Sequence, residues 1–157
     1  MRAGSLQMDA VDQRIVALLV ADARASFAEI GARVSLSAPA VKRRVDRLRA
    51  GGVIKGFTAV IEPAAVGWTT EAFVELFCTG RTTPAQITLA ARRHPEVIGA
   101  YTISGQADAL VHLRAADIGH LEQALERLRA EPFVTSTRSM VVLSRLVETP
   151  TPVPAPD

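Results

Sequence analysis

Cysteine and aromatic residues are scarce in this chain of 157 residues. Cys78 is the only cysteine, so no disulfide can form within the chain, which fits a reducing compartment. Aromatic residues make up 4%, so a hydrophobic core has to be aliphatic. The sequence has no apolar run of about 18 residues, which argues against a membrane-spanning helix. Its first seven residues lack the apolar segment of a signal peptide. We therefore expect a cytoplasmic protein without a membrane partner.

Residue patterns that would indicate an enzyme are also missing. The three histidines are His94, His112 and His120, and their spacings match no common metal site. Cys78 falls on an alternating apolar pattern, which favours a buried small hydrophobe over a nucleophile. No GxSxG, phosphate-binding loop or HExxH motif is present. We expect a protein that binds other molecules, without catalysis, cofactor or metal.

Charge is divided unevenly along the chain, although its net value is only +2. Residues 1–60 hold ten Lys or Arg and five Asp or Glu, while residues 61–157 hold eight and eleven. The front is therefore basic and the back acidic. Hydrophobic residues make up 48%, enough for a packed core. The division predicts two modules, of which the basic one suits a polyanion.

The segment 27–50 predicts a helix, a tight turn and a second helix whose outer side is basic. A further helix is expected over residues 9–21. Val41, Val45 and Leu48 are spaced i, i+4, i+7, so they share one buried face of the second of these helices. Two consecutive glycines, at 51 and 52, then end that helix.

A helix with aliphatic side chains on one side and guanidinium groups on the other suits the major groove of DNA. Arg43 and Arg47 are expected to read bases, because arginine can bind guanine O6 and N7 together. For Arg44, an ion pair with an acid such as Asp12 remains an equal alternative to DNA contact. The predicted DNA-contacting residues are Ser37, Pro39, Ala40, Lys42, Arg43, Arg44, Arg47, Arg49 and Lys55.

The residues after this helix are expected to form the two short strands of a wing, over 53–61. A hinge is expected at 62–70. Residues 71–147 then alternate strand and helix in the order β-α-β-β-α-β, the ferredoxin-like α+β pattern. The last strand is predicted over 134–147. Four prolines fall in residues 148–157, which predicts a disordered or polyproline-like tail.

The sheet expected in the second module has one apolar face that its own helices do not cover. The ferredoxin-like pattern places its helices on one side of an antiparallel sheet, so the other apolar face needs a cover. A second copy of the chain is the obvious cover, which predicts a homodimer.

Four motifs make the chain resemble the Lrp/AsnC family of transcriptional regulators, over about residues 8–148. They are MDAVDQRIVALL, EIGARVSLSAPAVKRRVDRLRAGGVIKGFTA, ISGQADALV and TRSMVVL. The resemblance implies a winged helix-turn-helix domain and a βαββαβ domain that binds a small effector, often an amino acid. It also implies dimers that assemble further, commonly into octamers. Ser35 departs from the family pattern, where many members have glycine.

The resemblance places the effector between dimers, near the turn at 104–108. Gly105 lets a backbone approach closely, Asp108 can pair with an ammonium group, and exposed amides can hold a carboxylate. A plain hairpin turn is the alternative, and Ala107 stands where larger side chains often occur in the family. The predicted effector-binding residues are Tyr101, Ser104, Gly105, Gln106, Ala107, Asp108, Thr137, Ser139 and Val141.

Two other functions remain open from the sequence. A basic module repeated on a disc could wrap DNA with little sequence preference, as a nucleoid-architectural protein does. Sirohaem decarboxylases resemble the same two-domain scaffold, but nothing in the residues specifically suggests a tetrapyrrole site.

Overall fold

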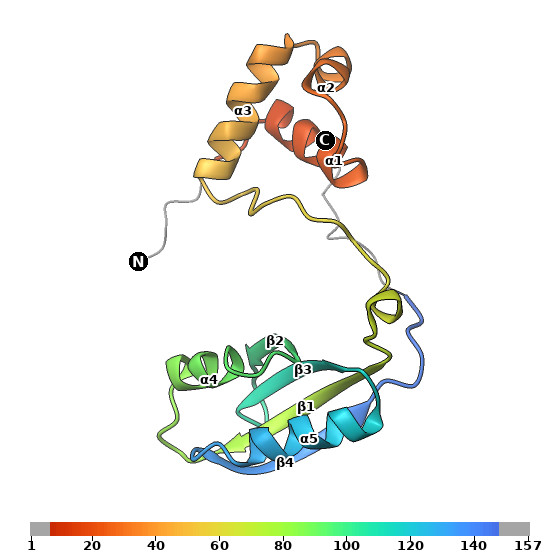
Figure 1. Ribbon diagram of the computed structural model, residues 1–157. Helices are drawn as coiled ribbons and strands as arrows, with labels where there is room; N and C mark the ends of the chain where they lie inside the picture. The colour runs from red at the N-terminus through yellow and green to blue at the C-terminus, as the bar shows by residue number, and fades with distance from the viewer. Residues whose placement is uncertain (1–6, 148–157) are drawn as a thin grey trace. The chain divides into compact units, whose positions relative to one another are not determined.

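The computed structural model describes residues 7–147, which form two compact units (Figure 1). The first unit ends at Ala59 and is helical, and the second begins at Val60 and is built on a sheet. The α+β fold class predicted from the sequence is confirmed. None of the helices in the described range has the length and apolar character needed to cross a membrane. The predicted disordered tail at 148–157 lies outside the described residues.

Three helices make the first unit: α1 (Ala10–Ala21), α2 (Phe27–Val34) and α3 (Ala38–Ala50). α1 and α2 each begin with a capping box, in which a side chain and a backbone amide three residues apart exchange hydrogen bonds. Asp9 and Asp12 form the box of α1, and Ser26 and Glu29 form that of α2. Aliphatic residues from all three helices fill the core, namely Ile15, Leu19, Ile30, Val34, Val41 and Val45.

The turn between α2 and α3 requires two unusual backbone features. A Cβ added to Gly31 would lie 2.3 Å from the carbonyl oxygen of Leu36, so no larger residue fits there without moving the turn. Ser35 ends α2 in the left-handed region, with φ 56°. This is the position where many family members carry glycine, which adopts a positive φ without the clash that a Cβ meets.

The predicted wing at 53–61 is wrong, because these residues form no strand. The amides of Val53 and Ile54 both donate to the carbonyl of Leu48, which only closes the end of α3. Beyond them Phe57, Val60 and the rest of the segment are exposed. A strand needs a hydrogen-bonded neighbour, and no described strand lies beside this segment.

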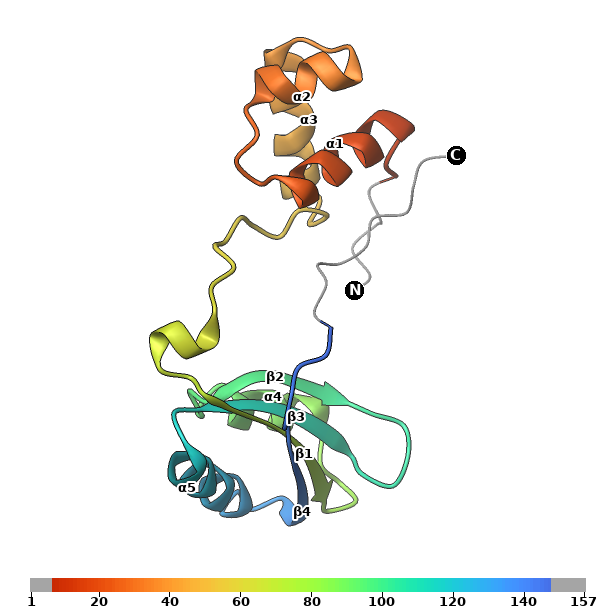
Figure 2. The same ribbon diagram turned by 90° about the vertical axis from the view of Figure 1, so that its right-hand side faces the viewer.

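The second unit is the expected βαββαβ arrangement. Its elements are a 3₁₀ turn η1 (Pro63–Val66), β1 (Thr70–Cys78), α4 (Pro84–Ala91), β2 (Val97–Thr102), β3 (Ala109–Ala115), α5 (Ile118–Arg129) and β4 (Val134–Val141). The strands form one antiparallel sheet in the order β2-β3-β1-β4 (Figure 2). η1 falls inside the predicted hinge at 62–70, and its Pro63 is buried.

The last strand is shorter than predicted, since it ends at Val141 and not at residue 147. β4 is an edge strand whose only neighbour is β1, and the final contact joins the amide of Val142 to the carbonyl of Glu71. Val141 pairs with Ala72 and β1 begins at Thr70, so only two residues of β1 remain beyond that pair.

The two faces of the sheet differ in what covers them. Ala72, Val74 and Leu76 of β1 lie in the core with Ile87 of α4 and Leu121 of α5. The opposite face carries the alternate residues of each strand. The buried residues of α4 and α5 pack on the core face, and no helix of the described residues contributes to a core on this one. Its side chains include Phe73, Phe77, Leu110, Tyr101, Arg138 and Met140.

Candidate nucleic-acid interface and effector turn

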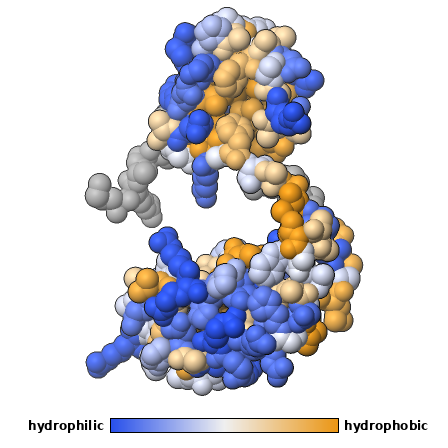
Figure 3. All heavy atoms as spheres, in the orientation of Figure 1, coloured by the Kyte–Doolittle hydropathy of each residue, from blue (hydrophilic) through white to orange (hydrophobic). Residues whose placement is uncertain are grey.

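Helix α3 has a buried face and an exposed cationic face. Val41, Val45 and Leu48 are buried, as their spacing predicted. Lys42, Arg43 and Arg49 are exposed. Figure 3 shows apolar and polar side chains segregated on the surface of the helical unit. The helix therefore offers cations to solvent while its aliphatic side is anchored in the core.

Two other arginines of α3 turn back to α1 and meet a buried acid. Asp12 has a fully buried side chain, with 0% of its surface exposed. Arg44 Nη1 donates to Asp12 at 2.8 Å and to Asp9 at 2.7 Å. Arg47 Nη2 also donates to Asp12. These four side chains, called the Asp12 network below, tie α3 to the start of α1.

The Asp12 network changes the charge that α3 can present. Arg44 adopts the ion pair that the sequence left open as an alternative to DNA contact. Arg47 was expected to face outward with Arg43, yet its guanidinium lies on Asp12. The hydrogen bond from Arg44 holds the pKa of Asp9 below its usual value, so this carboxylate stays ionised and keeps its partner. Two of the five cations are thereby neutralised.

The cationic side chains left on the outer face of α3 differ in whether they form an ion pair. Lys42 donates to Asp46 at 2.7 Å, but both side chains are more than half exposed, so this pair is weak. Arg43 and Arg49 form no ion pair with other described residues. Arg43 is therefore the least committed guanidinium in the middle of the helix.

The other predicted DNA-contacting residues lie at the ends of the interface. Ser37 occupies the N-cap position of α3, but its hydroxyl makes no capping hydrogen bond and is free for another acceptor or donor. Pro39 follows in the first turn, exposed, with Ala40 partly buried beside it. Both lie one turn before Arg43 and on its side of the helix. Lys55 is exposed in the segment after α3.

The predicted effector turn links β2 to β3. Gly105 has φ 138°, a backbone conformation that favours glycine. Ser104 and Gln106 are exposed, but Ala107 is buried. Asp108 fastens the turn to β1, because its Oδ2 accepts a hydrogen bond of 2.7 Å from the amide of Cys78. One carboxylate oxygen of Asp108 is thus already used within the chain.

The remaining predicted effector residues are not brought together in one chain. Tyr101 lies on β2, at one edge of the sheet, while Thr137, Ser139 and Val141 lie on β4 at the other edge. Three strand spacings separate the edges, about 14 Å. The register also places Tyr101 on the open face and the three β4 residues on the helix side. Thr137 accepts a hydrogen bond from Arg129.

Two buried acids in the sheet unit were not singled out from the sequence. Glu131 is held by Arg93 and His94, and Glu96 is held by His120 and Arg127. Each pair joins segments more than 20 residues apart, so no local spacing marks it. The only sequence feature that could have pointed to Glu131 and Glu96 is that each is an acid among apolar residues.

Comparison with known proteins agrees with both units. Residues 8–49 match the AsnC-type helix-turn-helix domain, and residues 71–152 match the Lrp/AsnC ligand binding domain. A helix-turn-helix transcriptional regulator of Mycobacterium tuberculosis is 54% identical over 142 residues, which is 90% of this chain and 96% of the relative. The regulator LrpA of the same organism is 34% identical over 137 residues, covering 87% and 91%.

Solved structures give the same result. A feast or famine regulatory protein of M. tuberculosis, in complex with L-methionine, superposes with a TM-score of 0.87 at 32% identity. The match covers 94% of this chain and 100% of that one. These relatives carry the names of transcriptional regulators and not of enzymes. The matched domains and the whole-length relatives show that this chain belongs to the Lrp/AsnC family of helix-turn-helix transcriptional regulators.

Proposed function

We propose that α3 reads DNA through Arg43, and that contacts to phosphates come from the residues around it. The carrying observation is the exposed position of Arg43, which has no counter-ion among the described residues. Pro39 and Ala40, one turn earlier, can approach base methyl groups. Lys42, Arg49 and Lys55 act as phosphate contacts, and the free hydroxyl of Ser37 can donate to a phosphate.

Arg44 and Arg47 act chiefly through position in this proposal. Their guanidinium groups hold α3 against α1 through the Asp12 network. Arg47 is still 47% exposed, so its free N–H groups can reach a phosphate while the bond to Asp12 persists. A base contact by Arg47 would require it to give up its hydrogen bond to the buried carboxylate of Asp12, which would leave Arg44 as the one arginine on that carboxylate, and this loss is costly.

We further propose an amino-acid effector at the turn 104–108. A relative of similar structure was solved with L-methionine. The exposed backbone at Ser104, Gly105 and Gln106 can face a carboxylate, and the second oxygen of Asp108 can accept from an ammonium group. Tyr101 and the β4 residues lie too far apart in one chain, so they line this site only where copies meet.

We propose that the chain forms a homodimer through the open face of the sheet, and that these dimers assemble further into an octamer, as the family resemblance implies. Phe73 stacks on His112, and Tyr101 and Met140 are exposed there, so an apolar surface meets water. In a symmetric dimer, one α3 per copy would read each half of an inverted repeat. Acting on chromosomal DNA, such a regulator would work in the cytoplasm.

The DNA-reading role is tested by gel shifts on the native operator and on unrelated DNA. Arg43→Ala should weaken operator binding by about 1–3 kcal/mol and relax the preference at one base pair. Arg49→Ala should weaken binding to both DNAs alike and lower the salt slope by about 1. Arg81→Ala, an exposed change in the sheet unit, is the matched control. Unchanged operator preference in Arg43→Ala would refute base reading by Arg43, and equal affinity for both DNAs in the parent would favour the DNA-wrapping function.

The effector role is tested by calorimetric titration of the twenty amino acids into the full chain. One or a few should release heat, and Asp108→Ala should abolish that signal because it removes the partner of the ammonium group. Loss of Asp108 also removes the bond to the Cys78 amide. Asp108→Asn therefore serves as a second variant, which keeps an acceptor for that amide but loses the charge. Binding that survives in Asp108→Asn would remove the carboxylate from the site.

A further inference from the structure

Asp46 is the only acid in α3, and it lies among the cations of the outer face. At about 100° per residue, Pro39, Arg43 and Asp46 fall within about 60° of one another, opposite the buried stripe of the helix. The side chain of Asp46 is 51% exposed. The face that we propose enters the major groove therefore carries one carboxylate near its centre.

A carboxylate at this place has few favourable partners on DNA. When ionised it only accepts hydrogen bonds, and it is repelled by the phosphates that the surrounding cations attract. In the major groove, guanine O6 and N7 and thymine O4 are acceptors as well. The groups that can donate to it are the exocyclic amino groups, N4 of cytosine and N6 of adenine. A carboxylate on this face therefore discriminates between bases in a way that a cation does not.

Cytosine is the better partner of the two. Adenine presents the acceptor N7 next to its N6 amino group, whereas cytosine presents its N4 amino group without an acceptor beside it. Lys42 Nζ donates to Oδ2 of Asp46 at 2.7 Å, and no described residue bonds the other carboxylate oxygen. Asp46 thus has one oxygen free to accept from a base while Lys42 holds the other.

Asp46 and Arg43 lie close enough along α3 to act on neighbouring bases. Three residues of helix advance about 4.5 Å along the helix axis, and one base pair advances about 3.4 Å along the duplex. The two side chains therefore reach the same base pair or adjoining ones. Guanidinium and carboxylate are complementary in what they bind, because arginine reads the acceptors of guanine and aspartate reads a donor.

We propose that Asp46 selects cytosine in each half-site, within one base-pair step of the guanine bound by Arg43. Its free oxygen accepts a hydrogen bond from N4 of the cytosine, and it repels any base that places an acceptor there. Lys42 keeps the carboxylate on this face and has two further N–H groups for a phosphate. This inference rests on the proposed function of α3 in reading DNA.

The test selects binding sites from a pool of randomised duplexes with the full chain, and sequencing gives the base preference at each position. Asp46→Ala should lower the preference for cytosine at one position about 10-fold, while the preference for guanine within one step of it remains. The same variant should bind unrelated DNA more tightly, because one repelling charge is gone.

Asp46→Asn gives a sharper result than loss of preference. A carboxamide both donates and accepts, so it can bind N6 and N7 of adenine together. The preferred base at that position should therefore change from cytosine to adenine. Asp22→Asn is the matched control, since it makes the same substitution at an exposed position in the same unit. Asp22 ends α1 and lines a hollow with residues of α1 and α2 only, so no base preference should change.

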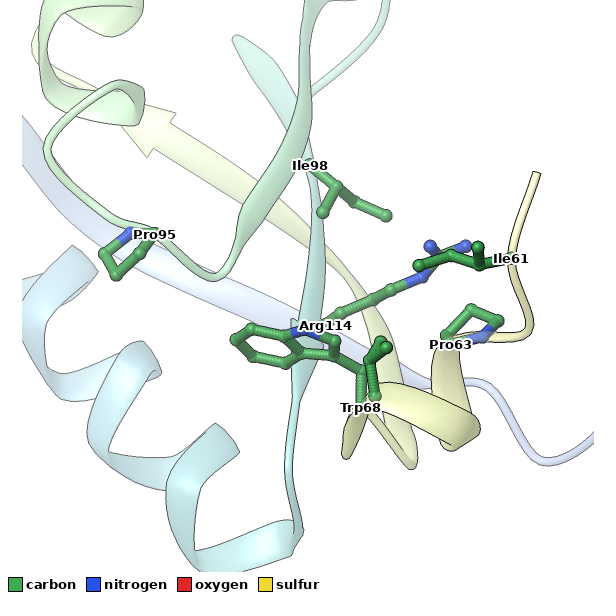
Figure 4. A pocket seen from close by; sticks show the side chains of 7 residues that line it. Ile61, Pro63, Trp68, Pro95, Ile98 and Arg114 are labelled. Atoms are coloured by element: carbon green, nitrogen blue, oxygen red, sulfur yellow. The ribbon is translucent and has the colours of Figure 1, made fainter. Parts of the chain in front are cut away.

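Folding of the variants is checked in each unit separately. Asp46 and Lys42 are both more than half exposed, so the helical signal in circular dichroism should be unchanged. Trp68 is the only tryptophan, and Figure 4 shows it beside Arg114 in the sheet unit. Its fluorescence should therefore be the same in all variants.

Two results would overturn the role of Asp46 alone. One is an equal gain in affinity for every duplex in Asp46→Ala with the cytosine preference intact, because Asp46 would then only repel the backbone. The other is a parent that selects guanine but no cytosine within one step of it. A parent without any base preference would refute base reading by α3 as a whole, and the role of Asp46 with it. Loss of the cytosine preference in Asp46→Ala would support the inference even where Arg43→Ala changes nothing.

Discussion

The two units of this regulator stabilise buried acids in different ways. In the helical unit, Asp12 is held by Arg44 and Arg47, two arginines from one helix. In the sheet unit, Glu131 and Glu96 are each held by one arginine and one histidine. A guanidinium group offers five N–H donors in a planar fork that matches a carboxylate, whereas an imidazole ring has only two nitrogens. The helical unit thus holds its buried acid with two guanidinium groups, whereas the sheet unit shares each buried acid between one guanidinium group and one imidazole ring.

This difference matters because the two sets of ion pairs hold different things. The Asp12 network holds α3, the helix that we propose reads DNA, against α1. The pairs at Glu131 and Glu96 join helix ends to strand connections within the sheet unit. Two arginines on one buried acid therefore fix α3 to α1 from two positions along the helix.

Asp12→Ala gives the largest expected effect and tests whether the helical unit depends on its network. Removing one partner of a buried pair costs about 3–5 kcal/mol. Arg44 and Arg47 are partly exposed and regain water, so we expect about 2–3 kcal/mol lost from unfolding of the helical unit. Urea denaturation followed by far-ultraviolet circular dichroism measures it, while Trp68 fluorescence follows the sheet unit separately.

Asp46→Ala is the control for that measurement. It removes an exposed pair with Lys42 on the same helix, worth about 0.3–0.5 kcal/mol. If Asp12→Ala cost no more than Asp46→Ala, the contrast between the units would fail, because the buried network would be contributing nothing.

Glu131→Gln sharpens the comparison through pH. Burial alone would raise the pKa of Glu131, but hydrogen bonds from Arg93 and His94 outweigh it and the pKa lies below the usual 4.5. A depressed carboxylate pKa adds stability that is present above about pH 4.5 and is lost as pH falls through the folded-state pKa. We expect Glu131→Gln to lower the unfolding free energy of the sheet unit by about 1–2 kcal/mol at pH 7. The further fall in this free energy as the solution is acidified should be smaller than in the parent. Urea denaturation followed by Trp68 fluorescence at several pH values measures both.

Glu126→Gln is the matched control for Glu131→Gln. Glu126 pairs with Arg129 on the same helix but is mostly exposed, so its removal should leave the pH profile nearly unchanged. An acid profile of Glu131→Gln as steep as that of the parent would exclude Glu131 as a source of the pH dependence.

Ser35→Gly gives the smallest expected effect. It tests the backbone strain at Ser35, which is the one residue other than glycine with a positive φ among the described residues and lies in the helical unit. A left-handed residue with a Cβ costs about 1–2 kcal/mol, and glycine returns part of that as lost backbone entropy. We expect a gain of about 0.5 kcal/mol in the unfolding free energy of the helical unit. Ser37→Gly, at φ −71°, has no such strain and should give no gain.

Much of the helical unit was predictable because its signals are local. The spacing of Val41, Val45 and Leu48 predicted the buried face of α3, and the glycines after residue 50 predicted its end. Arg47 shows where the same reasoning stopped. A helical projection places its Cα opposite the core, but its long side chain reaches sideways to Asp12, 35 residues earlier.

The failed wing shows the same limit for strands. Residues 53–61 have strand-forming composition, yet a strand exists only when another backbone pairs with it, and the described chain provides none. The effector residues show a further case. Tyr101 and Thr137 were grouped by resemblance, but one sheet holds them at opposite edges.

The sequence by itself determined the two units, the order of helices and strands, and the family, because periodicity, capping residues and short motifs are properties of neighbouring positions. Only the tertiary structure decided which cations of α3 remain free, how Asp108 fastens its turn, and that Tyr101 and Thr137 lie at opposite edges of one sheet. Those outcomes depend on contacts between residues far apart in the chain, whose distances no local pattern encodes.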